Sequence, residues 1–340
     1  MKQLIGRVKS RYVPSALILL YHRISELQSD PQLLSVTPKH FAEHLEVLGS
    51  KAQPLALEQL ANNFIQGRIP NRGVVVTFDD GYSDNLRFAK PILEHYDMPA
   101  TVFISAGEIG SEREFWWDEL ERLILQPGIM PESLSLNIQG EALKWKMGMD
   151  AEVQEQERPQ NRAWTVIDKT DSSLRQRVYR DLYERLRTLP LREQQNVLDD
   201  LSKLTGAQPT IRSDYLPLTP DEIIDMVKGG LIEVGAHTVT HPILSTLSCS
   251  AQQKEIDQSK SQLEKIAGRH MTSFAYPFGA KTDYTSETIS LVREAGFTCA
   301  CSNFPEVIWK GADPFQLPRI LVRDMDGDAF ARLLRKYWGD

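Results

Sequence analysis

Long apolar runs are absent from this sequence of 340 residues. The first apolar stretch, Ala16–Tyr21, is too short to cross a membrane or to form the hydrophobic part of a secretory signal. His22 and Arg23 follow it, where a signal would carry small residues at a cleavage site. We therefore expect no membrane span and a cytoplasmic protein, or a mature form that has lost its leader.

Cysteine is scarce, and basic residues are outnumbered by acidic ones. The three cysteines, Cys249, Cys299 and Cys301, contain no C-x-x-C pair and cannot all pair with one another. Free cysteines are usually small buried side chains, so this usage fits a reducing compartment. The formal net charge of −7 counts against a nucleic-acid partner, because phosphate-binding proteins usually present a basic face. The apolar share of 41% is that of an ordinary globular protein.

Apolar runs that alternate with amphipathic stretches predict parallel strands connected by helices. The predicted strands are 16–21, 74–78, 101–104, 232–236, 272–276, 297–301 and 320–322, and three well-marked helices are 38–48, 219–228 and 283–295. Thr37 and Thr219 are the expected N-caps of the first two helices, since a proline follows each of them at the first helical position. Gly296 is the expected left-handed cap of the third.

Strand signals are sparse between about residues 108 and 215, where charged and glutamine-rich stretches dominate. We interpret this region as a mostly helical insertion into one β/α domain that spans residues 1–340. The insertion could cap or flank the active site, or contact a partner. Its segment Phe115–Trp117 could stack on sugars, but an amphipathic helix that buries Trp116 and Leu120 explains it equally well.

Two adjacent carboxylates, Asp79 and Asp80, follow the predicted strand 74–78. In β/α folds the loops after the strands carry the reactive side chains. Neighbouring carboxylates repel one another unless a cation or a proton resolves the clash, and Gly81 permits the tight turn they need. Because adjacent strand residues face opposite sides, one carboxylate can bind a metal while the other addresses a water molecule. A solvated Asp-Asp-Gly turn is the simpler alternative.

Two histidines, His237 and His241, follow the predicted strand 232–236. Their spacing of four would place them on one face of a helical turn, which suits metal chelation, although surface histidines are an alternative. With one of the two aspartates they provide three ligands and leave a position for water, as in catalytic zinc sites. The other carboxylate could then act as general base in acyl hydrolysis. A non-haem iron oxygenase uses a similar ligand set, but its close His-x-Asp pair is absent here.

Both segments match known motifs. Thr77–Tyr82 and His237–His241 resemble the first two motifs of the polysaccharide deacetylases of carbohydrate esterase family four, and Tyr276–Gly279 resembles the third. The resemblance covers about residues 14–107 and 216–325. It implies a distorted (β/α) barrel with fewer than eight strands. It also implies that Asp79 is the catalytic base. By the same resemblance, a divalent metal, usually zinc, is bound by Asp80, His237 and His241. The backbone N–H of Tyr82 would donate to the oxyanion.

The chain departs from this family at two functional positions. An arginine normally orients the base from two residues before the third motif's proline, where this chain has Ala275. Arg319 is the candidate substitute, with a surface arginine as the alternative. The family's late general-acid histidine is also missing, since no histidine follows His270. His22 resembles the early acid of the permuted branch that deacetylates poly-N-acetylglucosamine, with a structural histidine as the alternative. As an acid it must be protonated when the amine leaves, so its working pKa should be near or above neutral.

We therefore expect a metal-dependent hydrolase that removes acetyl groups, N-linked in preference to O-linked, from a polysaccharide or glycan, with Zn²⁺ as its metal. Two other functions stay open at this point. One is amide hydrolysis on a small non-sugar substrate. The other is a glycan-binding relative without turnover, which the missing third-motif arginine would explain. Acetate release separates an enzyme from such a relative.

Overall fold

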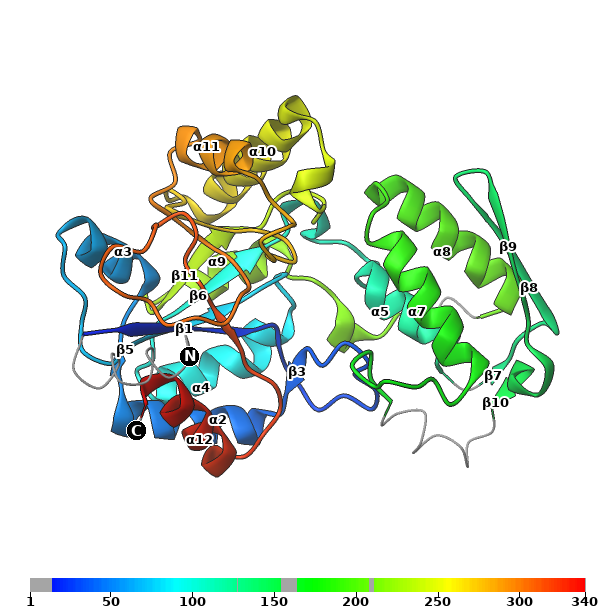
Figure 1. The fold of residues 1–340 in the computed structure, drawn as a ribbon, viewed down its shortest axis with the longest axis horizontal. Coiled ribbons are helices and arrows are strands. Elements are labelled where there is room, and N and C mark those ends of the chain that lie inside the picture. Colours follow the sequence, from blue (N-terminus) through cyan, green and yellow to red (C-terminus); the bar gives the residue numbers. More distant parts are fainter. Residues whose placement is uncertain (1–13, 127, 154–163, 208–210, 340) are drawn as a thin grey trace. The chain divides into compact units, whose positions relative to one another are not determined.

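The computed structural model describes residues 14–126, 128–153, 164–207 and 211–339. The chain forms two compact units, the first from residues 1–26, 34–110 and 217–340 and the second from residues 27–33 and 111–216. Figure 1 shows their elements coloured along the chain. Within the described residues, we find no helix whose length and apolar character would let it cross a membrane.

The first unit is built on one curled parallel sheet. Its neighbouring strands are, in order, β13 (Cys299–Cys301), β12 (Ser273–Ala275), β11 (Ile232–Ala236), β6 (Ala100–Ile104), β5 (Gly73–Phe78), β1 (Ala16–Tyr21) and β14 (Ile320–Leu321), and β4 (Gln53–Pro54) pairs with β5 outside this path. A parallel bridge between Cys301 and Leu317 links β13 to the segment before β14, which brings the two ends of the path together. The predicted distorted barrel with fewer than eight strands along its path is confirmed. Two-residue strands β2 (Arg23–Ile24) and β3 (Ser35–Val36) pair separately.

Helices connect these strands. They are α2 (Pro38–Lys51), α3 (Leu57–Ile65), the π-helical η1 (Asn85–Ala89), α4 (Lys90–His95), η2 (Ala106–Glu108), α9 (Pro220–Val227), η6 (Leu244–Thr246), α10 (Cys249–Ala267), α11 (Ser286–Glu294) and α12 (Gly327–Trp338). The predicted caps are confirmed, because the Thr37 hydroxyl accepts the His40 amide and Thr219 forms a capping box with Glu222. Gly296 has a φ of +79°, as expected of a residue that ends a helix. In Figure 1, α2 and α12 lie side by side near the C-terminus.

Apolar side chains fill both faces of the sheet. β1 and β5 are buried along their whole length, because helices cover one face and the closed interior covers the other. Cys299 and Cys301 lie in the interior cluster, as expected for free cysteines. The same expectation is wrong for Cys249, which is exposed at the first position of α10.

The second unit combines helices with short antiparallel pairs. Its elements are α5 (Trp116–Ile124), β7 (Gly128–Ile129), β8 (Ser133–Ile138), β9 (Glu141–Lys146), η3 (Gly148–Ala151), β10 (Glu152–Val153), α7 (Leu174–Leu186), α8 (Leu191–Thr205) and η5 (Ser213–Tyr215). β8 pairs with β9 and β7 with β10, both antiparallel. The sequence prediction overlooked these strands, although β8 alternates exposed and buried side chains along its length.

The aromatic segment at the start of α5 is packed inside this unit. Trp116 is 6% exposed and Trp117 is 5% exposed. The Trp117 ring stacks on Phe115 at 5.0 Å between centroids, and Trp116 lies 5.1 Å from the Tyr183 ring. The interpretation of this segment as a buried amphipathic helix is therefore confirmed, and the rings are not available as an open sugar platform.

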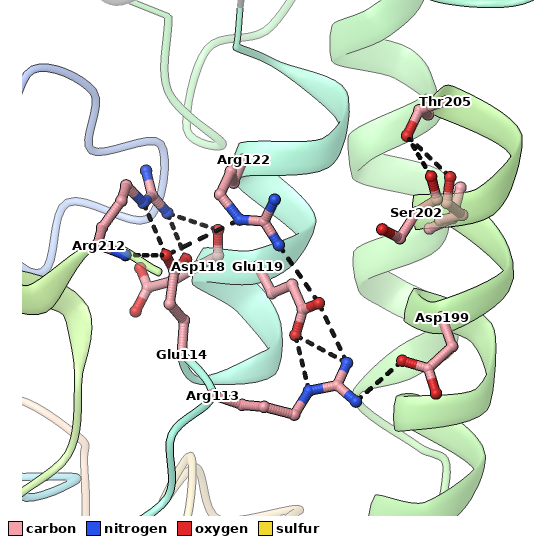
Figure 2. A network of polar contacts seen from close by, with 10 residues as sticks. Arg113, Glu114, Asp118, Glu119, Arg122, Asp199, Ser202, Thr205 and Arg212 are labelled. Atoms are coloured by element: carbon pink, nitrogen blue, oxygen red, sulfur yellow. Dashed lines mark hydrogen bonds and ion pairs between the residues drawn. The ribbon is translucent and has the colours of Figure 1, made fainter. Parts of the chain in front are cut away.

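A network of ion pairs joins the beginning and the end of the 111–216 segment, as Figure 2 shows. Arg212 donates to Glu114 at 2.7 Å and to Glu121 at 2.7 Å, and both carboxylates are buried. Arg113 pairs with Glu119 at 2.9 Å and with Asp199 of α8 at 2.9 Å. Because bidentate arginine pairs fix geometry as well as charge, these contacts hold the entry and exit of the segment next to each other.

Candidate functional site

The predicted site residues come together after the ends of the central strands. Asp79 and Asp80 follow β5, His22 follows β1, and His237 follows β11. Arg319 lies one residue before β14 and reaches the same place because its long side chain extends to Asp79. Parallel strands end at one edge of a sheet, so residues distant in sequence meet there.

The two aspartates lie in a turn after β5, where side chains no longer alternate between the two faces of the sheet. β5 ends at Phe78, and Asp80 has a left-handed φ of +72°. The amide of Asp79 donates to Tyr21 and the carbonyl of Asp80 accepts from Ser105, which holds the turn between β1 and β6. Gly81 is required here, since its φ is +86° and a Cβ atom would lie 2.9 Å from the Ile104 side chain.

Both carboxylates consequently approach the same histidine. Nε2 of His237 lies 3.8 Å from an Asp79 oxygen and 3.7 Å from an Asp80 oxygen. Strand alternation predicts opposite faces for the two carboxylates, which is wrong because the left-handed Asp80 ends the strand geometry. Their different surroundings, and not opposite faces, distinguish the two carboxylates.

Asp80, His237 and His241 form a group of potential metal ligands. Their candidate ligand atoms all lie within 4.8 Å of one another, the one such group found among the described residues. Nδ1 of His237 lies 2.8 Å from the Ala275 carbonyl, which can only accept, so Nδ1 carries the proton and Nε2 keeps its lone pair for a cation. Nε2 of His241 is 3.4 Å from Asp80.

The histidine pair is brought together by a loop and not by the helical turn expected from its spacing. Residues 237–241 contain no helix, and both Thr238 (φ +65°) and His241 (φ +54°) are left-handed. The His241 amide donates to the Thr238 hydroxyl at 3.1 Å, which closes the loop. The two rings then lie 4.9 Å apart. The expected pairing is right, and the expected helical geometry is wrong.

The electrostatics favour the metal-ligating form of both rings. Burial is the main cause that lowers the pKa of His237, with Arg319 adding to it, although Asp79 opposes the shift. Burial and the neighbouring His237 together lower the pKa of His241 well below its usual value. Both imidazoles are therefore neutral near pH 7, and a neutral imidazole is the form that binds a metal ion.

The end of β12 and the segment after it support both histidines without supplying a charged group. The Ala275 carbonyl fixes His237, and the Phe278 ring lies 4.9 Å from the His241 ring. Phe278 also has a left-handed φ of +58°. The third motif thus contributes the aromatic contact of Phe278, the last residue of β12 contributes a backbone carbonyl, and Ala275 stands where the resemblance would place an arginine.

Arg319 holds Asp79 in a buried bidentate pair. Its two terminal nitrogens donate to the two Asp79 oxygens at 2.7 Å each, and its Nε donates to the Ser302 carbonyl at 2.8 Å. Arg319 is 1% exposed, so the alternative of a surface arginine is wrong. Burial would raise the pKa of Asp79, but Arg319 and His237 outweigh it and lower that pKa to about 2. Asp79 is consequently a carboxylate at neutral pH.

His22 lies close enough to this pair for both charges to act on its pKa, and the residue is partly buried. Its carbonyl accepts from Asn85 at 2.9 Å, and its Nδ1 is buried with no hydrogen-bond partner among the described residues. Burial lowers the pKa of His22 to about 4, although the Asp79 charge alone would raise it. The resting protein therefore holds His22 neutral at pH 7, since burial and the nearby Arg319 outweigh the carboxylate, and the pKa expected of the working acid stays a prediction.

Three residues that the sequence argument passed over support this corner of the site. Asp84 accepts from Arg23 Nε at 2.9 Å and from the Ile24 amide at 3.2 Å, and both side chains of the ion pair are buried. The Arg23 guanidinium lies 4.3 Å from the centre of the Tyr82 ring, so Tyr82 is fixed beside the aspartate turn. Asn85 connects Asp84 to the His22 carbonyl. The signal in the sequence was a third aspartate, followed by an asparagine, with one residue between it and the Asp-Asp-Gly-Tyr segment.

Comparison with known proteins gives consistent matches. The family described as polysaccharide deacetylase matches residues 66–180 and 193–300. The poly-β-1,6-N-acetyl-D-glucosamine N-deacetylase of Staphylococcus aureus (strain MSSA476) is 32% identical over 111 residues, which are 29% of this chain and 38% of that enzyme. The chain spans about two fifths of the length of such curated relatives.

Two solved structures share the fold over nearly their whole length. The Streptococcus pyogenes deacetylase PplD, solved with acetate, has a TM-score of 0.58 at 17% identity and covers 95% of this chain and 99% of its own. IcaB from Ammonifex degensii has a TM-score of 0.57 at 17% identity and covers 96% and 97%. At this identity the likeness concerns the fold alone.

Proposed function

Because the chain belongs to the polysaccharide deacetylase family, nearest to the branch that deacetylates poly-N-acetylglucosamine, we propose that it is a metal-dependent hydrolase that removes N-acetyl groups from a glycan. The observation that carries this proposal is the position of Asp79. It is ion-paired with Arg319 and also lies within 4 Å of the His237 that adjoins Asp80. A fixed carboxylate beside a ligand set is what hydrolysis of an amide by activated water requires.

The residues of the site fit a divalent cation. Asp80, His237 and His241 offer one carboxylate and two neutral imidazoles, the donor set of catalytic zinc sites. The His237 Nδ1–H bond to the Ala275 carbonyl directs Nε2 toward the other two ligands, which supports the same fit. A bound Zn²⁺ would polarise the acetyl carbonyl and lower the pKa of a water molecule.

In this proposal Asp79 takes the proton from the attacking water. It is ionised at neutral pH, and Arg319 occupies both of its oxygens in one plane, so the carboxylate cannot rotate away. The attack forms a C–O bond and places negative charge on the former carbonyl oxygen. The backbone N–H of Tyr82, directly after the Asp79–Gly81 turn, would donate to that oxygen.

His22 would deliver the proton to the leaving nitrogen as the C–N bond breaks. Its imidazole lies close enough to Asp79 for that charge to act on its pKa, and its backbone is held by Asn85. Because its pKa in the resting protein is about 4, His22 starts neutral, so the proton that Asp79 takes from water must reach it before it can be passed on. The products are acetate and the free amine of the sugar.

Acetate release is the direct test of the proposed function. The purified protein should release acetate from N-acetylated glucosamine oligomers, lose that activity in a chelator, and regain it with Zn²⁺. Elemental analysis should find about one divalent ion per chain, and His237→Ala should abolish stoichiometric binding because it removes one of three ligands. Release from O-acetyl glycans only, or from small non-sugar amides only, would contradict the proposed substrate. Full metal content in His237→Ala would contradict the ligand set.

The proposed acid role makes a separate prediction for His22→Ala. This variant should bind metal as the wild type does and lose about 10²- to 10⁴-fold in rate on N-acetyl substrates, because an amine leaves poorly without a proton. An aryl acetate should be affected much less, since a phenolate can leave unprotonated. Rates on both substrates, measured side by side, check the prediction. Equal losses on amide and ester would assign His22 a structural role.

The reason for considering a glycan-binding relative without turnover no longer applies. It rested on the missing third-motif arginine, and Arg319, one residue before β14, makes a bidentate contact to Asp79. The base therefore keeps an orienting partner.

A further inference from the structure

The loop that carries the two histidines is held by a carboxylate that takes no part in the proposed chemistry. Glu255 lies on α10, fourteen residues after His241. One of its oxygens accepts from the backbone amides of Val239 and Thr240, both at 2.8 Å. Its other oxygen accepts from the Thr240 hydroxyl, also at 2.8 Å. All three donors lie between His237 and His241.

The opposite side of the same loop is fixed by η2. The amide of Ala106 donates to the Thr238 carbonyl at 2.9 Å, and the amide of Gly107 donates to the Val239 carbonyl at 2.8 Å. A Cβ atom on Gly107 would lie 2.7 Å from the Val239 carbonyl oxygen, so η2 approaches the loop as closely as a backbone can. The loop is therefore clamped between Glu255 and η2.

Such a clamp is needed because the loop conformation is costly by itself. Thr238 and His241 both have positive φ values, and Thr238 is β-branched. Non-glycine residues adopt this region at a cost and remain there when their surroundings over-determine them. Without the Glu255 carboxylate, two adjacent amides would lose their acceptor and the loop could relax toward ordinary φ values. The distance between the two imidazoles would then change.

We propose that Glu255 is a positioning residue of the metal site, which sets the spacing of His237 and His241 through the backbone of the loop between them. The inference rests on the proposed function, because it concerns the same ligand set. Glu255 accepts from the backbone and the Thr240 hydroxyl of the loop between the two ligands, so its effect on a metal ion would be conveyed by loop geometry.

Zinc affinity of the apoprotein is the measurement that tests this role. We expect Glu255→Ala to weaken Zn²⁺ binding on the order of 10-fold in competition with a chromophoric chelator, as for other residues that orient ligands. Glu255→Gln should lose less, about 3-fold, because its amide oxygen can still accept from the loop. The visible spectrum of the Co²⁺-substituted protein should change in Glu255→Ala, since it reports ligand geometry.

The matched control is Glu264→Ala on the same helix. Glu264 accepts from the Met271 amide at 3.0 Å, beyond the end of α10, so its loss removes a carboxylate bond without touching the histidine loop. Its zinc affinity and Co²⁺ spectrum should match the wild type. Zinc affinity of Glu255→Ala within twofold of the wild type would overturn the proposal. If Glu255→Ala does not fold, a zinc affinity of Glu255→Gln within twofold of the wild type would overturn the proposal instead. Failure of the wild type to bind zinc would instead overturn the proposed metal site.

Discussion

Asp79→Asn is expected to lower kcat/KM on an acetylated glycan by about 10²- to 10⁴-fold while the protein keeps its metal. The amide of asparagine has nearly the shape of the carboxylate but cannot accept a proton from water. Asp79 is not one of the three clustered ligands, so the variant leaves them in place. Kinetics of acetate release, combined with elemental analysis of the same preparation, checks this outcome.

Asp80→Asn is the matched comparison, since it makes the same chemical change one residue away. Asp80 lies 3.4 Å from His241 and 3.7 Å from His237, and an amide oxygen is a weaker ligand than a carboxylate. This variant should therefore lose metal affinity together with activity. If the two variants lose metal equally, the roles assigned to the two carboxylates are wrong.

Arg319→Met should destabilise the protein by about 3–5 kcal/mol, because it leaves the buried Asp79 carboxylate without its partner. Asp79 is 4% exposed and Arg319 is 1% exposed, so water cannot replace the lost contact. Activity should fall as well, since Asp79 would no longer be held in one orientation. Denaturant unfolding of the apoprotein, followed by tryptophan fluorescence, measures the first effect.

The double variant Arg319→Met, Asp79→Asn separates the pair from general damage to the core. Once Asp79 is neutral, the unpaired charge no longer exists, so the double variant should be more stable than Arg319→Met alone. Additive losses of stability would mean that the two side chains do not act as a pair. Arg319→Lys should not restore full activity, because an ammonium group cannot bind both oxygens in a plane.

The sequence alone identified the seven strands along the path of the parallel sheet, the helix caps and most residues of the candidate site. Continuous apolar runs such as Ala16–Tyr21 could be assigned to buried parallel strands because burial on both faces requires them. The threonine-proline starts of α2 and α9 could be assigned because capping depends only on neighbouring residues. Asp80, His237 and His241 could be grouped because each follows a strand and has a metal-binding side chain.

Local pattern could not give the conformations of the turns that carry these residues. The left-handed Asp80 and the non-helical histidine loop depend on contacts from β6, η2 and α10, which lie elsewhere in the chain. The same holds for the strands β7 to β10 in a region that appeared helical, because a two-stranded pair is stabilised by the packing of the unit around it.

What the sequence determined by itself was therefore the kind of chemistry, since side-chain type and position after a strand are local properties. Tertiary structure decided which of these groups pair with one another and in which direction their pKa values shift. Arg319 reaches Asp79 across 240 positions because the sheet curls back on itself, and no periodicity records that meeting. The direction of the pKa shift of His22 was likewise decided by burial and by Arg319, and not by the carboxylate next to it. Pairing and burial are long-range properties, and they become fixed only when the barrel is assembled.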